Sequence, residues 1–436
     1  MSKFYFECNS CGHKTLSFKD WFDAGQKCAC CGDIYSKTRY ARDVDYKALL
    51  SKKVIPNLWH YKELLPLNGE QYTSFGEGVL PIDHWKNIEA IARDYFNVDC
   101  SLRVLRNDNN PGTGTFKDLA GTVVASVLAE NGIKDYVVAS TGNIGAALSR
   151  YLAVNNITLH AFIPENSPDL QQAEIASNGG NVFRVKGDYH VAKCLAKAFA
   201  KKHNFLLAAT GIDPTRIEAK KTMAYEIVRQ LGRQADVFVQ ALSGGTGPLG
   251  LFKGNEELIA RGIISKQTRL ILSQSYCCSP MADAYQKAKA EHFTGDWKTQ
   301  YPVYENPETD ITTIATGNPT LYPYVSDVVH KSGGDIVAVN EKIAKDTYKL
   351  VALLEGVKIG PAATIGVLGF FHAAKHGLIK NGDLVVLNSG EGAKRTPAYL
   401  SQFISDQYVS SVDDCAIQSI QQSREQAVLD YIDLIR

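Results

Sequence analysis

The stretch Tyr136-Val-Val-Ala-Ser-Thr-Gly-Asn-Ile144 decides the fold, because an apolar run of strand length leads through a short polar loop into a helical stretch. From about residue 100 the chain repeats this order. Alternation of strand-length runs and helices at this spacing predicts an α/β protein with mostly parallel sheets. The further apolar runs cover 159–163, 237–241, 270–273 and 383–387, and the helical stretches cover 118–131, 144–155, 190–203 and 217–231.

The composition fits a folded protein of more than one domain. The chain has 436 residues, more than the ~100–200 residues of one domain, and 45% of them are hydrophobic. Its 47 Lys and Arg nearly balance 46 Asp and Glu, so neither nucleic acid nor an anionic membrane is expected as the main partner. No apolar run approaches the ~20 residues of a membrane helix, and the first residues lack the apolar core of a secretion signal. We therefore expect a cytoplasmic protein.

Five of the ten cysteines fall within residues 8–31. Cys8 and Cys11 form one Cys-x-x-Cys pair, Cys28 and Cys31 form a second, and a glycine follows each pair. Four thiolates on two tight turns suit tetrahedral Zn²⁺ and leave no open position for a substrate, so this Zn²⁺ would be structural. Disulfides, which a cytoplasmic protein disfavours, are one alternative. Chance clustering and a ribbon without metal are the others.

The loop Asn110-Pro-Gly-Thr-Gly-Thr-Phe-Lys-Asp118 delivers Lys117 to the start of a predicted helix. Free backbone amides in such a segment can bind anions. A lysine placed there can form a Schiff base once its pKa is depressed. The alternative is a solvated surface lysine.

Three further polar loops follow predicted strands, where parallel sheets bind their ligands. The loop Ala139-Ser-Thr-Gly-Asn-Ile-Gly145 suits a carboxylate, or is simply a helix N-cap with a tight turn. The turn Ser243-Gly-Gly-Thr-Gly-Pro-Leu-Gly250 can surround a phosphate with amides. It matches neither the nucleotide P-loop nor the dinucleotide motif, which disfavours an ATPase or a dinucleotide enzyme. The last loop, Leu387-Asn-Ser-Gly-Glu-Gly-Ala-Lys-Arg395, offers a hydroxyl and two cations.

Together these loops suit a cofactor with an aldehyde, a phosphate and a ring, which pyridoxal phosphate (PLP) combines. Their order and spacing resemble the fold type II PLP enzymes, specifically the threonine synthase group. That group has Pro-Thr-Gly-Ser-Phe-Lys-Asp at the lysine loop and Ser-Thr-Gly-Asn-Thr where this chain has Ser140-Thr-Gly-Asn-Ile144. Its Asn-Pro-Tyr-Arg-Ile-Glu-Gly-Gln-Lys-Thr is similar to Asp213-Pro-Thr-Arg-Ile-Glu-Ala-Lys-Lys-Thr222. Ser74-Phe-Gly-Glu-Gly78 and Thr316-Gly-Asn-Pro319 also have counterparts.

The resemblance implies a tryptophan synthase β-like fold of two parallel-sheet α/β domains behind an N-terminal zinc-ribbon-like segment. The implied divisions are 1–45 for the ribbon, 46–405 for the catalytic region and 406–436 for a tail helix. A smaller mobile subdomain, about 118–225, would be inserted in the catalytic region. A homodimer is also implied.

The resemblance further implies the roles of single residues around the cofactor. Lys117 would hold PLP and act as acid and base at the substrate Cα. Asn143 would hydrogen-bond the 3′ oxygen of PLP, and Ser389 would face its pyridine nitrogen, which favours elimination and replacement chemistry. The cofactor phosphate would be bound by Gly244, Gly245, Thr246 and Gly247.

The substrate would be held by a second group of residues. The carboxylate would be gripped by Ser140, Thr141, Gly142 and Asn143. The leaving phosphate or an incoming anion would be bound by Arg216, Lys394 and Arg395, since guanidinium groups match oxyanions in bidentate fashion. For Lys394 a surface ion pair is an equal alternative.

Departures from the pattern bear on the reaction. Threonine synthases usually end with Thr-Gly-His-Gly-Leu-Lys-Asp, whereas this chain has Ser389-Gly-Glu-Gly-Ala-Lys-Arg395. Cysteate synthase, a relative that replaces the phosphate of O-phosphoserine with sulfite, is similar at Gly392-Ala-Lys-Arg395, Ser243-Gly-Gly-Thr-Gly247 and Gln274-Ser-Tyr-Cys-Cys-Ser-Pro-Met281. Its lysine loop, Thr-Cys-Ser-Phe-Lys-Glu, matches less well.

Our leading hypothesis from sequence is therefore β-replacement on O-phospho-L-serine, with sulfite as the small anionic nucleophile and L-cysteate as the product. The alternative is threonine synthase, which converts O-phospho-L-homoserine to L-threonine and phosphate. A second alternative is an inactive PLP-fold protein that binds a partner through its zinc ribbon.

Overall fold

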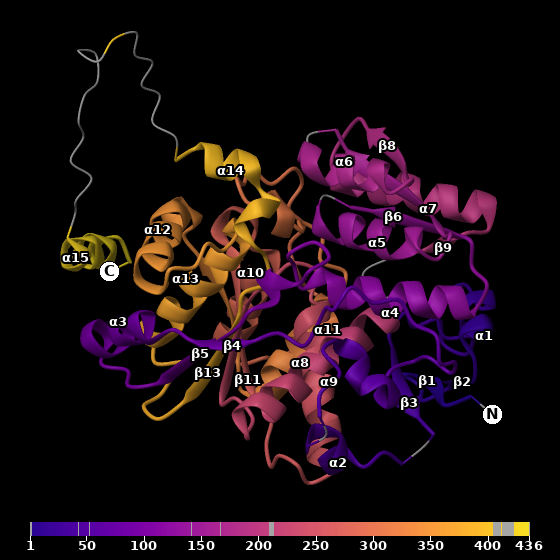
Figure 1. The fold of residues 1–436 in the computed structure, drawn as a ribbon, viewed down its shortest axis with the longest axis horizontal. Helices are drawn as coiled ribbons and strands as arrows, with labels where there is room; N and C mark the ends of the chain where they lie inside the picture. The colour runs from indigo at the N-terminus through magenta and orange to yellow at the C-terminus, as the bar shows by residue number, and fades with distance from the viewer. Residues whose placement is uncertain are drawn as a thin grey trace.

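The computed structural model describes residues 2–41, 43–51, 53–140, 142–165, 167–208, 213–403, 411 and 423–435. Its core holds two parallel sheets, with helices packed on both, and a small antiparallel sheet near the N-terminus (Figure 1). The predicted α/β fold with mostly parallel sheets is confirmed.

The larger sheet has the strand order β12-β11-β10-β13-β5-β4, and only the edge pair β4–β5 is antiparallel. Neighbouring residues of its central strands face opposite cores: Val237 and Val239 point into one cluster, and Phe238 into the other. Both faces are buried, so these strands are continuously apolar. The strands are β4 (Ile82–His84), β5 (Ser101–Leu105), β10 (Val237–Ala241), β11 (Arg269–Ser275), β12 (Asp335–Val339) and β13 (Leu384–Asn388).

Helices cover both faces of this sheet. One face packs against α3 (Lys86–Phe96), α12 (Ala344–Glu355) and α13 (Pro361–Lys375). The other face packs against α8 (Thr215–Leu231), α9 (Thr246–Ala260), α10 (Pro280–Ala290) and α11 (Tyr322–Ser332).

The smaller sheet has the order β8-β7-β6-β9 and is entirely parallel. Along β6, Tyr136 and Val138 join the large core, whereas Val137 and Ala139 face a small cluster with the alanines of α7. The strands are β6 (Asp135–Ala139), β7 (Thr158–Pro164), β8 (Asn181–Val185) and β9 (Leu206–Leu207). The helices are α4 (Lys117–Glu130), α5 (Asn143–Ala153), α6 (Asp169–Ser177) and α7 (Tyr189–His203).

The N-terminal cysteine segment, residues 2–41, forms a three-stranded antiparallel sheet of order β2-β1-β3, with α1 (Phe18–Asp23) beside it. The Trp21 ring packs 5.9 Å from that of Phe6 and anchors the segment. The segment also contacts the smaller sheet and a helix that covers the larger sheet. The Gln26 amide exchanges two hydrogen bonds with the backbone of Leu207 in β9, and Tyr324 of α11 donates to Asp33 at 2.6 Å. The strands are β1 (Phe4–Cys8), β2 (Lys14–Thr15) and β3 (Ser36–Tyr40).

Short elements complete the described chain. The last helix, α15 (Arg424–Ile435), packs on α12 through a hydrogen bond between the Tyr431 and Thr347 hydroxyls at 2.9 Å. Of the predicted tail helix, 406–436, residues 406–410, 412–422 and 436 lie outside the described residues. The other helices are α2 (Tyr46–Ser51) and α14 (Pro397–Ser401), with 3-10 turns at Leu58–Leu64, Asn107–Asn109, Tyr276–Cys278, Thr312–Ile314, Glu341–Ile343 and Ala393–Arg395.

Within the described ranges, no helix has both the length and the apolar character needed to span a bilayer.

Candidate active site

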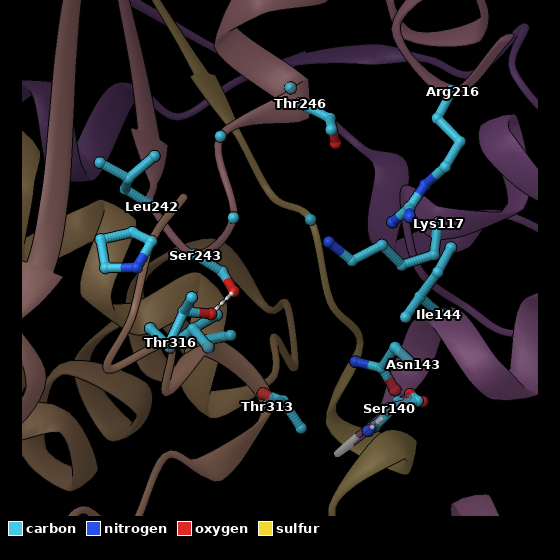
Figure 2. A pocket seen from close by; sticks show the side chains of 18 of the residues that line it. Lys117, Ser140, Asn143, Ile144, Arg216, Leu242, Ser243, Thr246, Thr313 and Thr316 are labelled. Atoms are coloured by element: carbon cyan, nitrogen blue, oxygen red, sulfur yellow. Dashed lines mark hydrogen bonds between the residues drawn. The ribbon is translucent and has the colours of Figure 1, made fainter. Parts of the chain in front are cut away.

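A cavity of about 420 Å³ collects the loops that follow β6, β10 and β13, together with the start of α4 (Figure 2). The carboxyl ends of parallel strands from both sheets therefore face one site. The sequence-predicted residues that line it are Lys117, Ser140, Gly142, Asn143, Arg216, Gly244, Gly245, Thr246 and Gly247.

Lys117, the first residue of α4, extends into this cavity (Figure 2). Its ammonium lies 4.2 Å from the centre of the Phe116 ring. Burial lowers the pKa of Lys117 to about 7; the positive charge of Arg216 adds to this effect, and Glu391 opposes it. At neutral pH a substantial fraction of this amine is therefore unprotonated and nucleophilic.

Asn143 begins α5 and is held from both sides. Its Oδ1 accepts from Nε of Arg395 at 3.1 Å, and its Nδ2 donates to Oε2 of Glu391 at 2.5 Å. Arg395 in turn makes two bonds of 2.6 Å to the carboxylate of Glu174 in α6. This chain of charge-assisted bonds fixes the amide of Asn143 at the cavity wall.

Glu391 is a cavity residue that our sequence reasoning missed. It is buried, it accepts from the Ala362 amide at 3.2 Å, and burial raises the pKa of its carboxyl. The available signal was its place between two glycines of the last loop, where the threonine synthase pattern has histidine.

The glycine-rich turn that leads into α9 has no room for a side chain at Gly245. Gly245 adopts φ +91°, and a Cβ there would lie 2.3 Å from Cγ2 of Val325. A Cβ on Gly247 would lie 2.6 Å from Nε2 of Gln240. The turn therefore brings bare backbone and the first amides of a 15-residue helix to the cavity, a setting that binds anions.

Arg216 lies in the cavity beside Lys117 (Figure 2). Its side chain is buried, and one Nη donates to the Ala208 carbonyl at 3.5 Å. Within the described chain, its Nε has no hydrogen-bond partner and the guanidinium has no carboxylate within 4.0 Å. A buried guanidinium in this state attracts an anion.

Ser389 is fully buried, and its hydroxyl has no partner within the described residues. Its neighbours Asn388, Gly390 and Glu391 line the cavity. Neither Ser389 nor Lys394 is itself among the lining residues; Lys394 is exposed, and Thr141 lies outside the described residues.

Other walls of the cavity come from segments that the sequence did not connect with it. Tyr189 and Lys193 of α7 contribute, and so does Ile34 of the cysteine segment. Thr316 lines the cavity too and shares a hydrogen bond of 2.9 Å with Ser243 (Figure 2). No local pattern marks Tyr189, Lys193 or Ile34 as cavity residues, because only the tertiary fold brings them there; Thr316 belongs to a motif shared with the threonine synthase group, but its place in the cavity was not predicted.

These features fit PLP. The cavity contains an amine of lowered pKa for an aldehyde and a turn of bare backbone for a phosphate, and the buried hydroxyl of Ser389, between residues of its wall, could serve a ring nitrogen. The three requirements stand on separate elements, so their meeting at one cavity is a property of the fold.

The four predicted metal ligands also meet. The sulfur atoms of Cys8, Cys11, Cys28 and Cys31 lie within 4.8 Å of one another, with Cys8–Cys31 at 3.5 Å and Cys11–Cys28 at 3.6 Å. Tetrahedral Zn²⁺ with Zn–S bonds of about 2.3 Å needs sulfur atoms about 3.8 Å apart. The cluster is therefore compatible with zinc.

Comparison with known proteins shows the family to which this chain belongs. The family described as "Pyridoxal-phosphate dependent enzyme" matches residues 82–390, and the chain belongs to that family. The chain is similar to the threonine synthase of Methanocaldococcus jannaschii, with 29% identity over 84% of this chain and 88% of that protein. The threonine synthase of Methanosarcina acetivorans is 29% identical over 77% of this chain and 79% of its own length.

A solved structure supports the fold. The cysteine synthase of Entamoeba histolytica superposes with a TM-score of 0.61, covering 91% of this chain and 99% of its own at 15% identity. The prediction of a fold type II PLP enzyme related to threonine synthases is thus confirmed, and the chain is a PLP-dependent enzyme of the synthase and lyase type. A closer relation to cysteate synthase stays a prediction.

Proposed function

We propose that this enzyme displaces phosphate from a phosphorylated amino acid, as a threonine synthase that converts O-phospho-L-homoserine to L-threonine and phosphate. The observation that carries this proposal is Arg216, a buried cation without a carboxylate partner in the described chain, set beside Lys117 in the cavity. An anionic group bound in the cavity would compensate such a cation, and we assign this place to the phosphate group of the substrate. The similarity to threonine synthases supports the same choice over sulfite chemistry.

The proposed roles follow the geometry. Lys117 holds the cofactor and then moves the proton at the substrate Cα, for which a pKa near the working pH is suited. PLP, when bound, supplies the electron sink that lets an amino acid lose this proton. With PLP bound, the hydroxyl of Ser389, which has no partner in the described chain, would be the residue to hold the ring nitrogen, and the Gly244–Gly247 turn would hold the cofactor phosphate.

The substrate carboxylate is bound at the start of α5. Ser140, Gly142 and Asn143 line the cavity there, and the amides of a helix N-terminus favour an anion. Arg216 binds the phosphate group that leaves. We leave Lys394 out of the proposed site because of its exposure, and Arg395 acts on Asn143 rather than on substrate.

A second candidate reaction is β-replacement on O-phospho-L-serine by sulfite. It is favoured by one observation: Glu391 and Arg395, which stand where threonine synthases have His and Asp, both hydrogen-bond Asn143. The amide of Asn143 is therefore held by different partners from those that the threonine synthase pattern provides. Such a change would alter how the substrate sits in the site.

The test compares both substrates on the holoenzyme. Threonine and phosphate should form from O-phosphohomoserine, and R216M should raise KM for this substrate by tenfold or more, because a charge-assisted bond contributes about 1.5–3 kcal/mol. R229M is the matched control, since Arg229 stands on the same helix with its guanidinium 2.7 Å from Glu226. An unchanged KM in R216M would contradict the role of Arg216. Cysteate from O-phosphoserine and sulfite, with no threonine from O-phosphohomoserine, would transfer the assignment to the second reaction.

Two further predictions belong with this proposal. We propose that the four-cysteine cluster binds structural Zn²⁺, which metal analysis of the purified protein tests. We also propose a homodimer, which sedimentation analysis tests. The domain divisions stay predictions.

A further inference from the structure

Lys220 is a buried lysine that stands outside every role given so far. It lies in α8, its exposed fraction is 0%, and its Nζ donates to Oγ1 of Thr246 at 2.9 Å. No carboxylate lies within 4.0 Å of its ammonium in the part of the chain that the structure describes. An ammonium ion removed from water without a counter-ion is strongly unfavourable.

The next residue shows how this fold treats a buried lysine that is structural. Lys221 is equally buried, but its Nζ lies 2.7 Å from Glu218 and 3.0 Å from Glu257. Of these two neighbouring lysines on α8, Lys221 therefore has carboxylate partners and Lys220 has none within 4.0 Å in the described chain. The negative charge of Asp213 acts on Lys220 only from beyond 4.0 Å.

The position of Lys220 shows where that anion would lie. Thr246 begins α9 directly after the glycine-rich turn, and the Phe116 ring, 5.4 Å from the Lys220 ammonium, also neighbours Lys117. Helices α8 and α9 are in close contact here, since a Cβ on Gly250 would lie 2.7 Å from Cβ of Lys220. The lysine is therefore held against the turn by rigid backbone.

The sequence makes this lysine a departure. The threonine synthase pattern Asn-Pro-Tyr-Arg-Ile-Glu-Gly-Gln-Lys-Thr has glutamine at this position, whereas this chain has Lys220. Burial, together with the positive charges of Lys117 and Arg216, holds the pKa of Lys220 well below its usual range, and the negative charge of Asp213 only partly opposes this shift. A dianionic phosphate at the turn would offset all three effects.

We propose that Lys220 is a cofactor-binding residue that supplies a positive charge to the phosphate of PLP at the Gly244–Gly247 turn. Thr246 orients the ammonium, and the helix N-terminus adds about half a charge of the same sign. The inference rests on the cofactor class of the family and is independent of which amino acid the enzyme uses.

The experiment measures binding of two cofactor forms to the cofactor-free full chain, PLP and pyridoxal, which lacks the phosphate. Absorbance or fluorescence titration gives both dissociation constants. K220Q introduces the residue of the threonine synthase pattern, and K220M removes both charge and hydrogen bond. Both should weaken PLP about ten- to hundredfold, as expected for a lost charge-assisted bond, and leave pyridoxal within about twofold.

K221M is the matched control. It removes a buried lysine of the same helix, so it should lower thermal stability while leaving the ratio of PLP to pyridoxal affinity unchanged.

Three results would overturn the proposal. An unchanged ratio in both Lys220 variants would make the lysine merely structural. PLP affinity retained by K220Q but lost in K220M would show that the hydrogen bond, and not the charge, matters. A raised KM for the phosphorylated substrate with unchanged PLP affinity would place the charge at the substrate phosphate.

Discussion

Replacing Gly245 by alanine should destabilise the glycine-rich turn in two ways, by a steric clash of the new Cβ and by backbone strain at a positive φ. The new Cβ would lie 2.3 Å from Cγ2 of Val325, so one of the two must move by about 1 Å to reach ordinary contact. The left-handed φ of +91° adds about 1–2 kcal/mol for a residue with a Cβ. Overpacking adds about 1–3 kcal/mol, so we expect G245A to lower the free energy of unfolding by about 2–5 kcal/mol.

Two further variants distinguish the backbone contribution from the steric contribution to this loss of stability. Gly262 has φ +65° with open space around it, so G262A should show only the backbone part, about 1–2 kcal/mol. The double variant G245A/V325A removes Cγ2 of Val325, the atom with which the new Cβ would clash. Its loss should be smaller than the sum of the two single losses by about 1–3 kcal/mol.

The assay is urea unfolding of the cofactor-free full chain followed by tryptophan fluorescence, comparing midpoints at constant slope. PLP affinity is measured alongside, because a turn displaced by about 1 Å should weaken phosphate binding by tenfold or more in G245A only. Equal losses in G245A and G262A, or additive losses in the double variant, would refute the steric argument.

The remaining predictions concern protons and metal. The rate at which the cofactor-free chain binds PLP should increase as pH rises through about 7, because only the neutral amine of Lys117 attacks the aldehyde. In stopped-flow absorbance measurements, R216M should raise the pKa of this profile and E391Q should lower it. Any other pair of directions would contradict the causes assigned to the pKa of Lys117. The pKa of Lys117 is about 7 in the folded chain and near 10.5 in the unfolded chain, so the unfolded chain binds more protons between these two pH values. The free energy of unfolding should therefore rise with pH in this range, and more steeply in the wild type than in K117M. Parallel unfolding curves for the two proteins at each pH would disprove this. C11S should lower the melting temperature and the zinc content, whereas C30S, which changes an exposed cysteine outside the cluster, should do neither.

Much of the fold could be predicted because several buried parallel strands are locally visible, although the largely buried strands β5 and β12 were not predicted. The apolar run predicted at 237–241 is strand β10, and the helix predicted over 190–203 is α7 extended by one residue. Strand β8 was missed, since it is an edge strand with only Val185 of its five residues buried. Strand β9 has two residues and leaves no pattern.

The residues of the candidate site likewise fall into those that a local sequence pattern predicts and those that only the tertiary structure reveals. Lys117, Asn143 and the glycine-rich turn were predictable, because each belongs to a short loop whose composition indicates its chemistry. The partner of Arg395 was not, since Glu174 lies more than 200 residues away on another helix. The same limit hid Glu391, whose importance comes from its contact with Asn143 across the cavity.

The cysteine segment contributes Ile34 to the cavity wall and holds β9 through Gln26, yet the family match begins only at residue 82. The shortest chain that can retain the whole cavity wall is therefore longer than the region that the family model matches. A fragment of residues 82–390, cut for ligand screening or fusion to another protein, would have an extra opening to solvent at Ile34. Small molecules selected against such a fragment would fit a site that the whole enzyme does not present.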